Sequence, residues 1–204
     1  MTQWAENTDL GRERGPVALL RAWVEVLVSP REFFRGKVAP GDQAPGLTFV
    51  AAVVLVSESI RLAVVDGAYP VIGGQPTASA VLWVLFVVVL VAPAGVHLTA
   101  ALQTVILIGT IEDRAGVSET VQVLCYATAP CVLVGLANPW VTGAVAVWGA
   151  ALLVVGLSEV HGVPLATALA VAAVPAALAF GYGFGGFESL AAVSEQARLL
   201  AGWA

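Results

Sequence analysis

The feature that most constrains this chain is a run of apolar sequence from Pro45 to Gly186, broken only by short polar turns. It contains about five stretches that could each cross the hydrocarbon core of a bilayer, which takes roughly 20 helical residues. Hydrophobic residues make up 59% of the 204 residues and charged residues only 11%. A soluble domain of this length leaves much of its area facing water and could not hide so much apolar surface. We therefore predict an all-α, polytopic membrane protein with a five-helix transmembrane bundle.

The turns divide the apolar run into five expected spans. They cover residues 46–65, 78–109, 119–137, 139–158 and 164–186. The second span is longer than a bilayer requires and has Pro93 in its middle, which predicts a kink, a strong tilt or an extension. In the third span Pro130 has no N–H, so the backbone carbonyl of Tyr126 loses its helical partner. Tyr126 and Pro130 are candidate pocket residues, with simple kinked packing as the alternative.

A polar segment of 45 residues precedes the spans and contains a candidate membrane anchor. From Pro16, apolar residues recur at three- and four-residue steps, which predicts an amphipathic helix too short to span. Aromatic side chains would enter the headgroup region there, and basic side chains would meet anionic lipid. The members of this candidate interfacial anchor are Trp23, Phe33, Phe34, Arg31, Arg35 and Lys37.

The placement of basic residues predicts the orientation in the membrane. Six of the nine Lys and Arg residues precede the first expected span, and the loop after that span has none. We expect the protein to lie in the cell membrane. Because basic residues concentrate in cytoplasmic loops, we expect its N-terminus to face the cytoplasm. Five spans then place the C-terminus outside. Residues 187–204 predict a C-terminal amphipathic helix with Trp203 on its apolar side.

The content of charged residues indicates which kind of organism the protein comes from and which classes of partner it can bind. The net charge is −5, with a single lysine, Lys37. An acid-rich, lysine-poor composition keeps a surface hydrated through net charge and favours a halophilic archaeon as the source, with a high-GC bacterium as the alternative. The sequence has no basic stripe, so we expect no nucleic-acid partner. The expected partners are the lipid bilayer and other membrane proteins or a second copy.

No motif in the chain predicts catalysis. A Gly-rich phosphate loop, an HExxH sequence and a CxxC pair are all absent from the sequence. Cys125 and Cys131 are six residues apart on one expected helix, so they point in different directions and cannot form a disulfide. We therefore expect a non-enzymatic protein without a cofactor.

Polar residues inside the expected spans are the candidate functional residues. Glu58 and Arg61 are three residues apart in the first span, share a helix face and can pair. Charges within a bilayer are costly and indicate function by default, although Arg61 could instead extend to the outer interface with Glu58 following it. His97 lies beyond Pro93 and could relay protons or bind a ligand. The alternative for His97 is a hydrogen bond to a neighbouring helix or a place near the cytoplasmic interface.

Glu159 and His161 form a candidate cytoplasmic turn between the fourth and fifth spans. Both side chains can bind metals, but two loop ligands do not make a metal site. We therefore predict no metal site here and treat the pair as a polar turn.

Three segments resemble the YIP domain family of integral membrane proteins, named for interacting with Ypt/Rab GTPases. Trp23 followed by residues 29–34 (SPREFF) looks like the family's N-terminal entry. Residues 126–130 (YATAP) look like its "YA.aP" stretch. Residues 148–162 with Ala168 look like its "W…G…HG…A" segment. The resemblance implies a five-span bundle with a cytoplasmic N-terminus, and for eukaryotic relatives a role in vesicle traffic.

Together these observations predict a membrane-embedded organising or scaffold protein of YIP type. The alternative is a small transporter or channel component that uses the intramembrane polar residues. An accessory subunit of another membrane complex is a third option. Convergence of the polar residues on a water-accessible cavity would favour transport, and a dry bundle would favour a scaffold.

Overall fold

The computed structural model describes residues 15–202, and every regular element within this range is helical. Five segments are long and apolar enough to cross a membrane, as predicted, and their bounds lie within a few residues of the expected spans. They are Ala44–Val64, Pro76–Thr110, Val117–Leu136, Pro139–His161 and Leu165–Gly183. The all-α, five-span prediction is thus confirmed. Trp203 lies outside the described residues.

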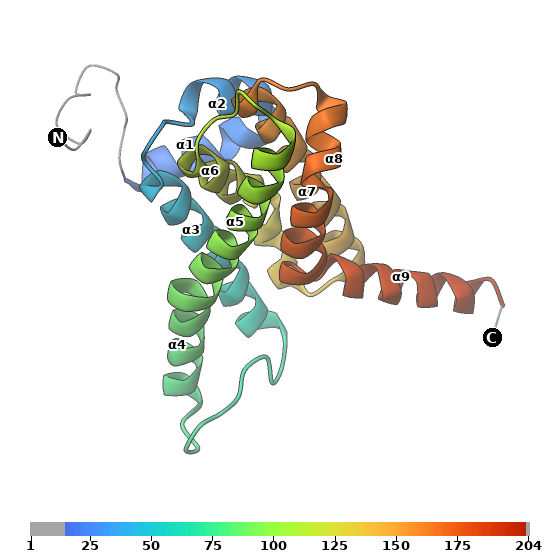
Figure 1. Cartoon of the computed structure of the whole chain (residues 1–204). Helices are drawn as coiled ribbons and strands as arrows, with labels where there is room; N and C mark the ends of the chain where they lie inside the picture. The colour runs from blue at the N-terminus through green and yellow to red at the C-terminus, as the bar shows by residue number, and fades with distance from the viewer. Residues whose placement is uncertain (1–14, 203–204) are drawn as a thin grey trace.

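The chain begins with two short helices, α1 (Pro16–Val28) and α2 (Pro30–Lys37), which pack beside the spans (Figure 1). The spans follow as α3 (Ala44–Val64); α4 (Pro76–Phe86), η1 (Val87–Val91) and α5 (Ala92–Thr110); α6 (Val117–Ala127) and η2 (Ala129–Leu136); α7 (Pro139–His161); and α8 (Leu165–Ala176) with η3 (Ala177–Gly183). The last helix is α9 (Gly186–Leu200).

We name the two ends of the bundle after the helices they carry. The α2 end holds α2, the linker that enters α3 and the loop between α5 and α6. The α9 end holds α9, the loop between α3 and α4 and the turn before α7 (Figure 1). Helix α9 extends sideways from this end, where Trp140 Nε1 donates to Gln196 Oε1 at 3.1 Å and Ser189 Oγ donates to the Pro139 carbonyl.

Proline residues explain why three spans leave regular α-helix. Pro93 cannot donate a backbone hydrogen bond and its ring crowds the preceding turn, and the chain just before it widens into the π-helical segment η1. There the N–H of Ala92 donates to the carbonyl of Val87, five residues back. A second π-helical segment, η3, follows Pro175, and the span through Pro130 tightens into the 3₁₀ helix η2. The predicted irregularity near Pro93 therefore takes the form of a π-helix.

The third span forms the centre of the protein and is its most buried span, whereas the second span is the most exposed. Glycines let neighbouring helices approach this centre closely. A Cβ at Gly135 of η2 would overlap the Ser57 carbonyl of α3, and one at Gly156 of α7 would lie 2.6 Å from Val123 of α6. The packed core also includes Phe33 and Phe34 of α2.

Candidate functional site

The aromatic residues near the α2 end form a continuous chain of five rings. Phe33 of α2 packs on Tyr126 of α6 with ring centroids 4.8 Å apart. Tyr126 packs on Phe49 of α3 at 5.1 Å, and Phe49 on Trp23 of α1 at 5.6 Å. Phe34 meets Phe33 edge to face, with ring centroids 5.6 Å apart. This ring chain joins α1, α2, α3 and α6, and such edge contacts are favoured by the charge distribution of aromatic rings.

The predicted aromatic anchor residues are packed inside the protein and not among lipid headgroups. Phe33 and Phe34 are only 3% and 1% exposed, so they contact protein and cannot enter the headgroup region as expected. Trp23 also turns inward, and its Nε1 donates to the Ala129 carbonyl at 2.9 Å. In an eight-residue helix with charges on its other faces, two adjacent aromatic residues supply the side that can be buried. The aromatic half of the anchor hypothesis is therefore wrong for Phe33 and Phe34.

The basic residues of α2 lie beside the end of α7. Arg31 Nη1 donates to Glu159 Oε1 at 3.1 Å, and Arg35 Nη2 donates to Glu159 Oε2 at 2.7 Å. Lys37 Nζ lies 3.8 Å from Glu25 Oε2 of α1. Both arginine side chains stay more than half exposed, whereas the Glu159 side chain is 10% exposed. One carboxylate thus fixes α2 against α7, and lipid binding by these basic residues stays a prediction.

Glu159 and His161 occupy the last turn of α7, where a connecting turn was predicted. The helix continues through His161 and ends at Gly162, which adopts a left-handed conformation at φ 66° that suits glycine. His161 is buried. Its Nδ1 accepts from the Ala115 N–H at 3.2 Å, so Nε2 carries the hydrogen and faces Thr120 Oγ1 at 3.4 Å. The imidazole therefore ties α7 to the loop and first turn of α6.

The linker into α3 is held by a buried amide that the sequence analysis did not single out. Gln122 of α6 is fully buried. Its Oε1 accepts from the Ala39 N–H at 3.2 Å, and its Nε2 donates to the Ala39 carbonyl at 2.7 Å. Both polar groups of one backbone residue are satisfied by one side chain. The sequence feature that could have indicated this contact is a glutamine inside an apolar span.

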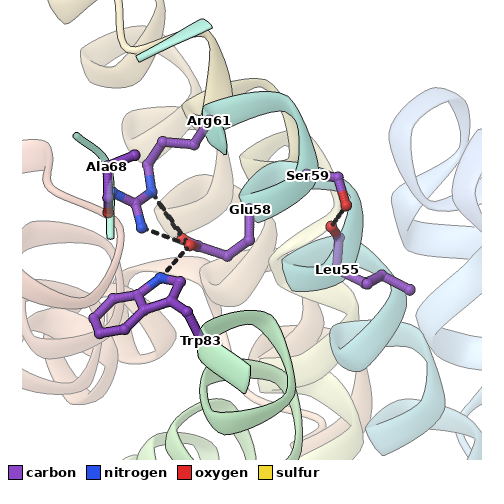
Figure 2. Close-up of polar contacts among 6 residues, drawn as sticks. All are labelled: Leu55, Glu58, Ser59, Arg61, Ala68 and Trp83. Atoms are coloured by element: carbon purple, nitrogen blue, oxygen red, sulfur yellow. Dashed lines mark hydrogen bonds and ion pairs between the residues drawn. The ribbon is translucent and has the colours of Figure 1, made fainter. Parts of the chain in front are cut away.

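Glu58 and Arg61 form a paired cluster in the last two turns of α3, and Figure 2 shows its contacts. Arg61 Nη2 donates to Glu58 Oε2 at 2.6 Å, and its Nη1 donates to the Ala68 carbonyl at 2.8 Å. Trp83 of α4 completes the cluster, because its Nε1 donates to Glu58 Oε2 at 3.1 Å and the Arg61 guanidinium lies 5.9 Å from its ring centroid. The pairing alternative agrees with this geometry. The cluster links α3, the following loop and α4.

A double-mutant cycle measures whether the Glu58–Arg61 pair stabilises the fold. The side chains are 16% and 28% exposed, so we expect Arg61→Ala and Glu58→Gln to show a coupling free energy of about 1–2 kcal/mol in unfolding. The pair Glu195–Arg198 is a matched control with the same spacing, because its side chains are 63% and 67% exposed and 3.8 Å apart. Its coupling should be close to zero. Equal coupling in the two cycles would contradict a structural role for the first pair.

The remaining predicted residues lie apart from this cluster. His97 of α5 is exposed, and its Nδ1 donates to the Pro93 carbonyl one turn earlier at 2.7 Å. Tyr126 belongs to the ring chain, and Pro130 is buried at the start of η2. The packing alternative for Tyr126 and Pro130 agrees with this arrangement. The structure thus separates the predicted polar residues into the Glu58–Arg61 cluster, an exposed histidine and a packed aromatic core.

The chain matches a known family over most of its length. The Yip1 domain matches residues 24–187, which include the ring chain except Trp23, the Glu58–Arg61 cluster and Glu159. A comparison with curated proteins and one with solved structures gave no match. Because the matched region covers well over half of the sequence, the chain belongs to the Yip1 domain family of membrane proteins.

Proposed function

We propose that this protein is a non-enzymatic scaffold that organises other membrane proteins through a fixed surface at its α2 end. The observation that carries the proposal is the meeting of distant segments there. Trp23, Phe33 and Tyr126 join in the ring chain, and Glu159 of α7 binds the arginines of α2. A surface held by a packed core and ion pairs keeps its shape, which lowers the entropy cost of binding a partner.

The separation of the polar residues argues against the transport alternative. A transport path through the bundle would need polar side chains that face one another along a shared route. Glu58 and Arg61 are hydrogen-bonded to each other, and Arg61 also bonds to Ala68 and Glu58 to Trp83. The polar groups of the cluster therefore bond to one another within the cluster. His97 is bonded to its own helix and exposed. These residues support packing between helices rather than a route for solutes.

We further propose that the α2 end faces the cytoplasm of the cell. Four basic residues lie at this end in α2 and the loop between α5 and α6, and a fifth, Arg21, lies on the adjoining helix α1. The four are Arg31, Arg35, Lys37 and Arg114. The bias of basic residues toward cytoplasmic loops supports this orientation. Labelling a Leu200→Cys variant, made without Cys125 and Cys131, with a membrane-impermeant reagent should then occur only from outside.

Affinity purification of the full chain from native membranes in mild detergent tests the scaffold. The variant Glu32→Arg/Gly36→Arg changes the exposed side of α2 without touching the core, since a Cβ at Gly36 meets nothing within 4 Å. We expect this variant to lose the proteins that copurify with the wild type. Glu58→Gln, at the other end, should retain them. Identical partners with the α2 variant, or solute flux in vesicles that depends on Glu58, would contradict the proposal.

A further inference from the structure

Helix α1 has three distinct faces. Val26 is fully buried, and Leu19, Ala22 and Trp23 pack beside it against the core. A second face is aliphatic and open. Its members recur at three- and four-residue steps and are 60–75% exposed: Val17, Leu20, Val24 and Val28. The third face carries Arg21 and Glu25, and Glu25 pairs with Lys37 of α2. Among residues 15–202, protein therefore covers only one of the two apolar faces.

The contacts of Trp23 place α1 between the α2 end and the middle of the bundle. Its indole donates to the carbonyl of Ala129, which lies 12 residues into the 20-residue span Val117–Leu136. At a rise of 1.5 Å per residue, this carbonyl lies about 18 Å from the start of that span. Trp23 also packs on Phe49, which lies five residues into α3, about 8 Å from the start of that helix. Since a bilayer's hydrocarbon core is about 30 Å thick, these contacts place α1 at hydrocarbon depth.

We propose that α1 is embedded sideways in one leaflet, with Val17, Leu20, Val24 and Val28 in contact with lipid acyl chains. The four side chains are aliphatic and form one face without an aromatic or charged member, whereas the cores of protein interfaces are enriched in aromatic residues and arginine. Arg21 and Glu25 border this face, as expected for a helix whose charged side chains extend toward the headgroups. Lipid contact at this face of α1 does not depend on whether α2 binds a partner.

Spin labels on the full-length protein in phosphatidylcholine–phosphatidylglycerol vesicles test this placement. Single cysteines are introduced at Leu20, Val24 or Arg21 after Cys125 and Cys131, both buried, are replaced with alanine. Collision with oxygen, which concentrates in hydrocarbon, is compared with collision with a polar nickel chelate, which is excluded from it. Leu98, which is 73% exposed on the second span, provides the lipid reference. Glu112, exposed in the loop before α6, provides the water reference.

The ratio of oxygen to nickel collisions decides the outcome. At residues 20 and 24 it should equal the ratio at residue 98 and exceed that at residue 112 on the order of tenfold, with residue 21 in between. Nickel access at residue 24 equal to that at residue 112 would overturn the proposal in favour of a water-facing helix. Low access to both probes would also overturn it, because the face would then be covered by protein. The substituted side chains at 20 and 24 are exposed, so these changes remove no core contact.

Discussion

Phe34→Ala is expected to lower the free energy of unfolding by about 3–5 kcal/mol. The ring is 1% exposed, meets Phe33 at the end of the ring chain and packs against Gly156, where an added Cβ would lie 3.0 Å from two of its ring atoms. Its removal leaves a cavity between α2 and α7 that the close helices cannot fill. Thermal or denaturant-induced unfolding in detergent measures the loss.

Phe86→Ala is the matched control for this substitution. Phe86 is 50% exposed on the second span, so its truncation should cost less than about 1 kcal/mol. Trypsin provides a second measurement, because α2 contains Arg31, Arg35 and Lys37. We expect Phe34→Ala to speed cleavage at these sites by loosening α2 from the core, while Phe86→Ala leaves it unchanged. Equal stability and equal cleavage in the two variants would show that the ring chain does not hold α2.

The length and apolar character of the five spans were predictable from the sequence because each span must by itself cross a layer of known thickness. The expected break between the third and fourth spans is also present, since Asn138 Oδ1 caps α7 by accepting from the backbone N–H groups of Trp140 and Val141. Pro93 and Pro130 predicted where two of the spans depart from regularity, whereas the π-helix after Pro175 was not predicted. The two prolines did not predict the form, because a bilayer span can accommodate a proline by a kink, a π-helix or a 3₁₀ segment.

The candidate site was predictable only where its partners are close in sequence. The spacing of Glu58 and Arg61 indicated their pairing, but Trp83 lies 25 residues away from Glu58 and has no local signal. Glu159 and Arg31 are separated by 128 residues. The basic neighbours of Phe33 and Phe34 suggested a membrane surface, whereas contacts with α6 and α7 decide that these rings are buried. Such contacts depend on helix packing, which periodicity within one segment does not specify.

Gly135→Ala is expected to destabilise the protein by about 3 kcal/mol, because overpacking a close helix contact forces the backbone to shift. An added Cβ would overlap the backbone carbonyl oxygen of Ser57 and lie 2.9 Å from the Cβ of Ile60. Neither neighbour is the free end of a flexible side chain, so α3 and η2 must separate. Denaturant-induced unfolding of the variant and the wild type measures the cost.

Gly109→Ala is the control, because Gly109 lies inside α5 and an added Cβ meets nothing within 4 Å. Alanine is preferred over glycine within a helix, so this variant should be as stable as the wild type or more stable by up to about 1 kcal/mol. If Gly135→Ala left the stability as unchanged as Gly109→Ala does, the contact between α3 and η2 could accommodate an added methyl group. Gly135 and Phe34 contact different residues, so the double variant should lose the sum of the two single losses. A smaller loss in the double variant would mean that loosening α2 already separates α3 from η2.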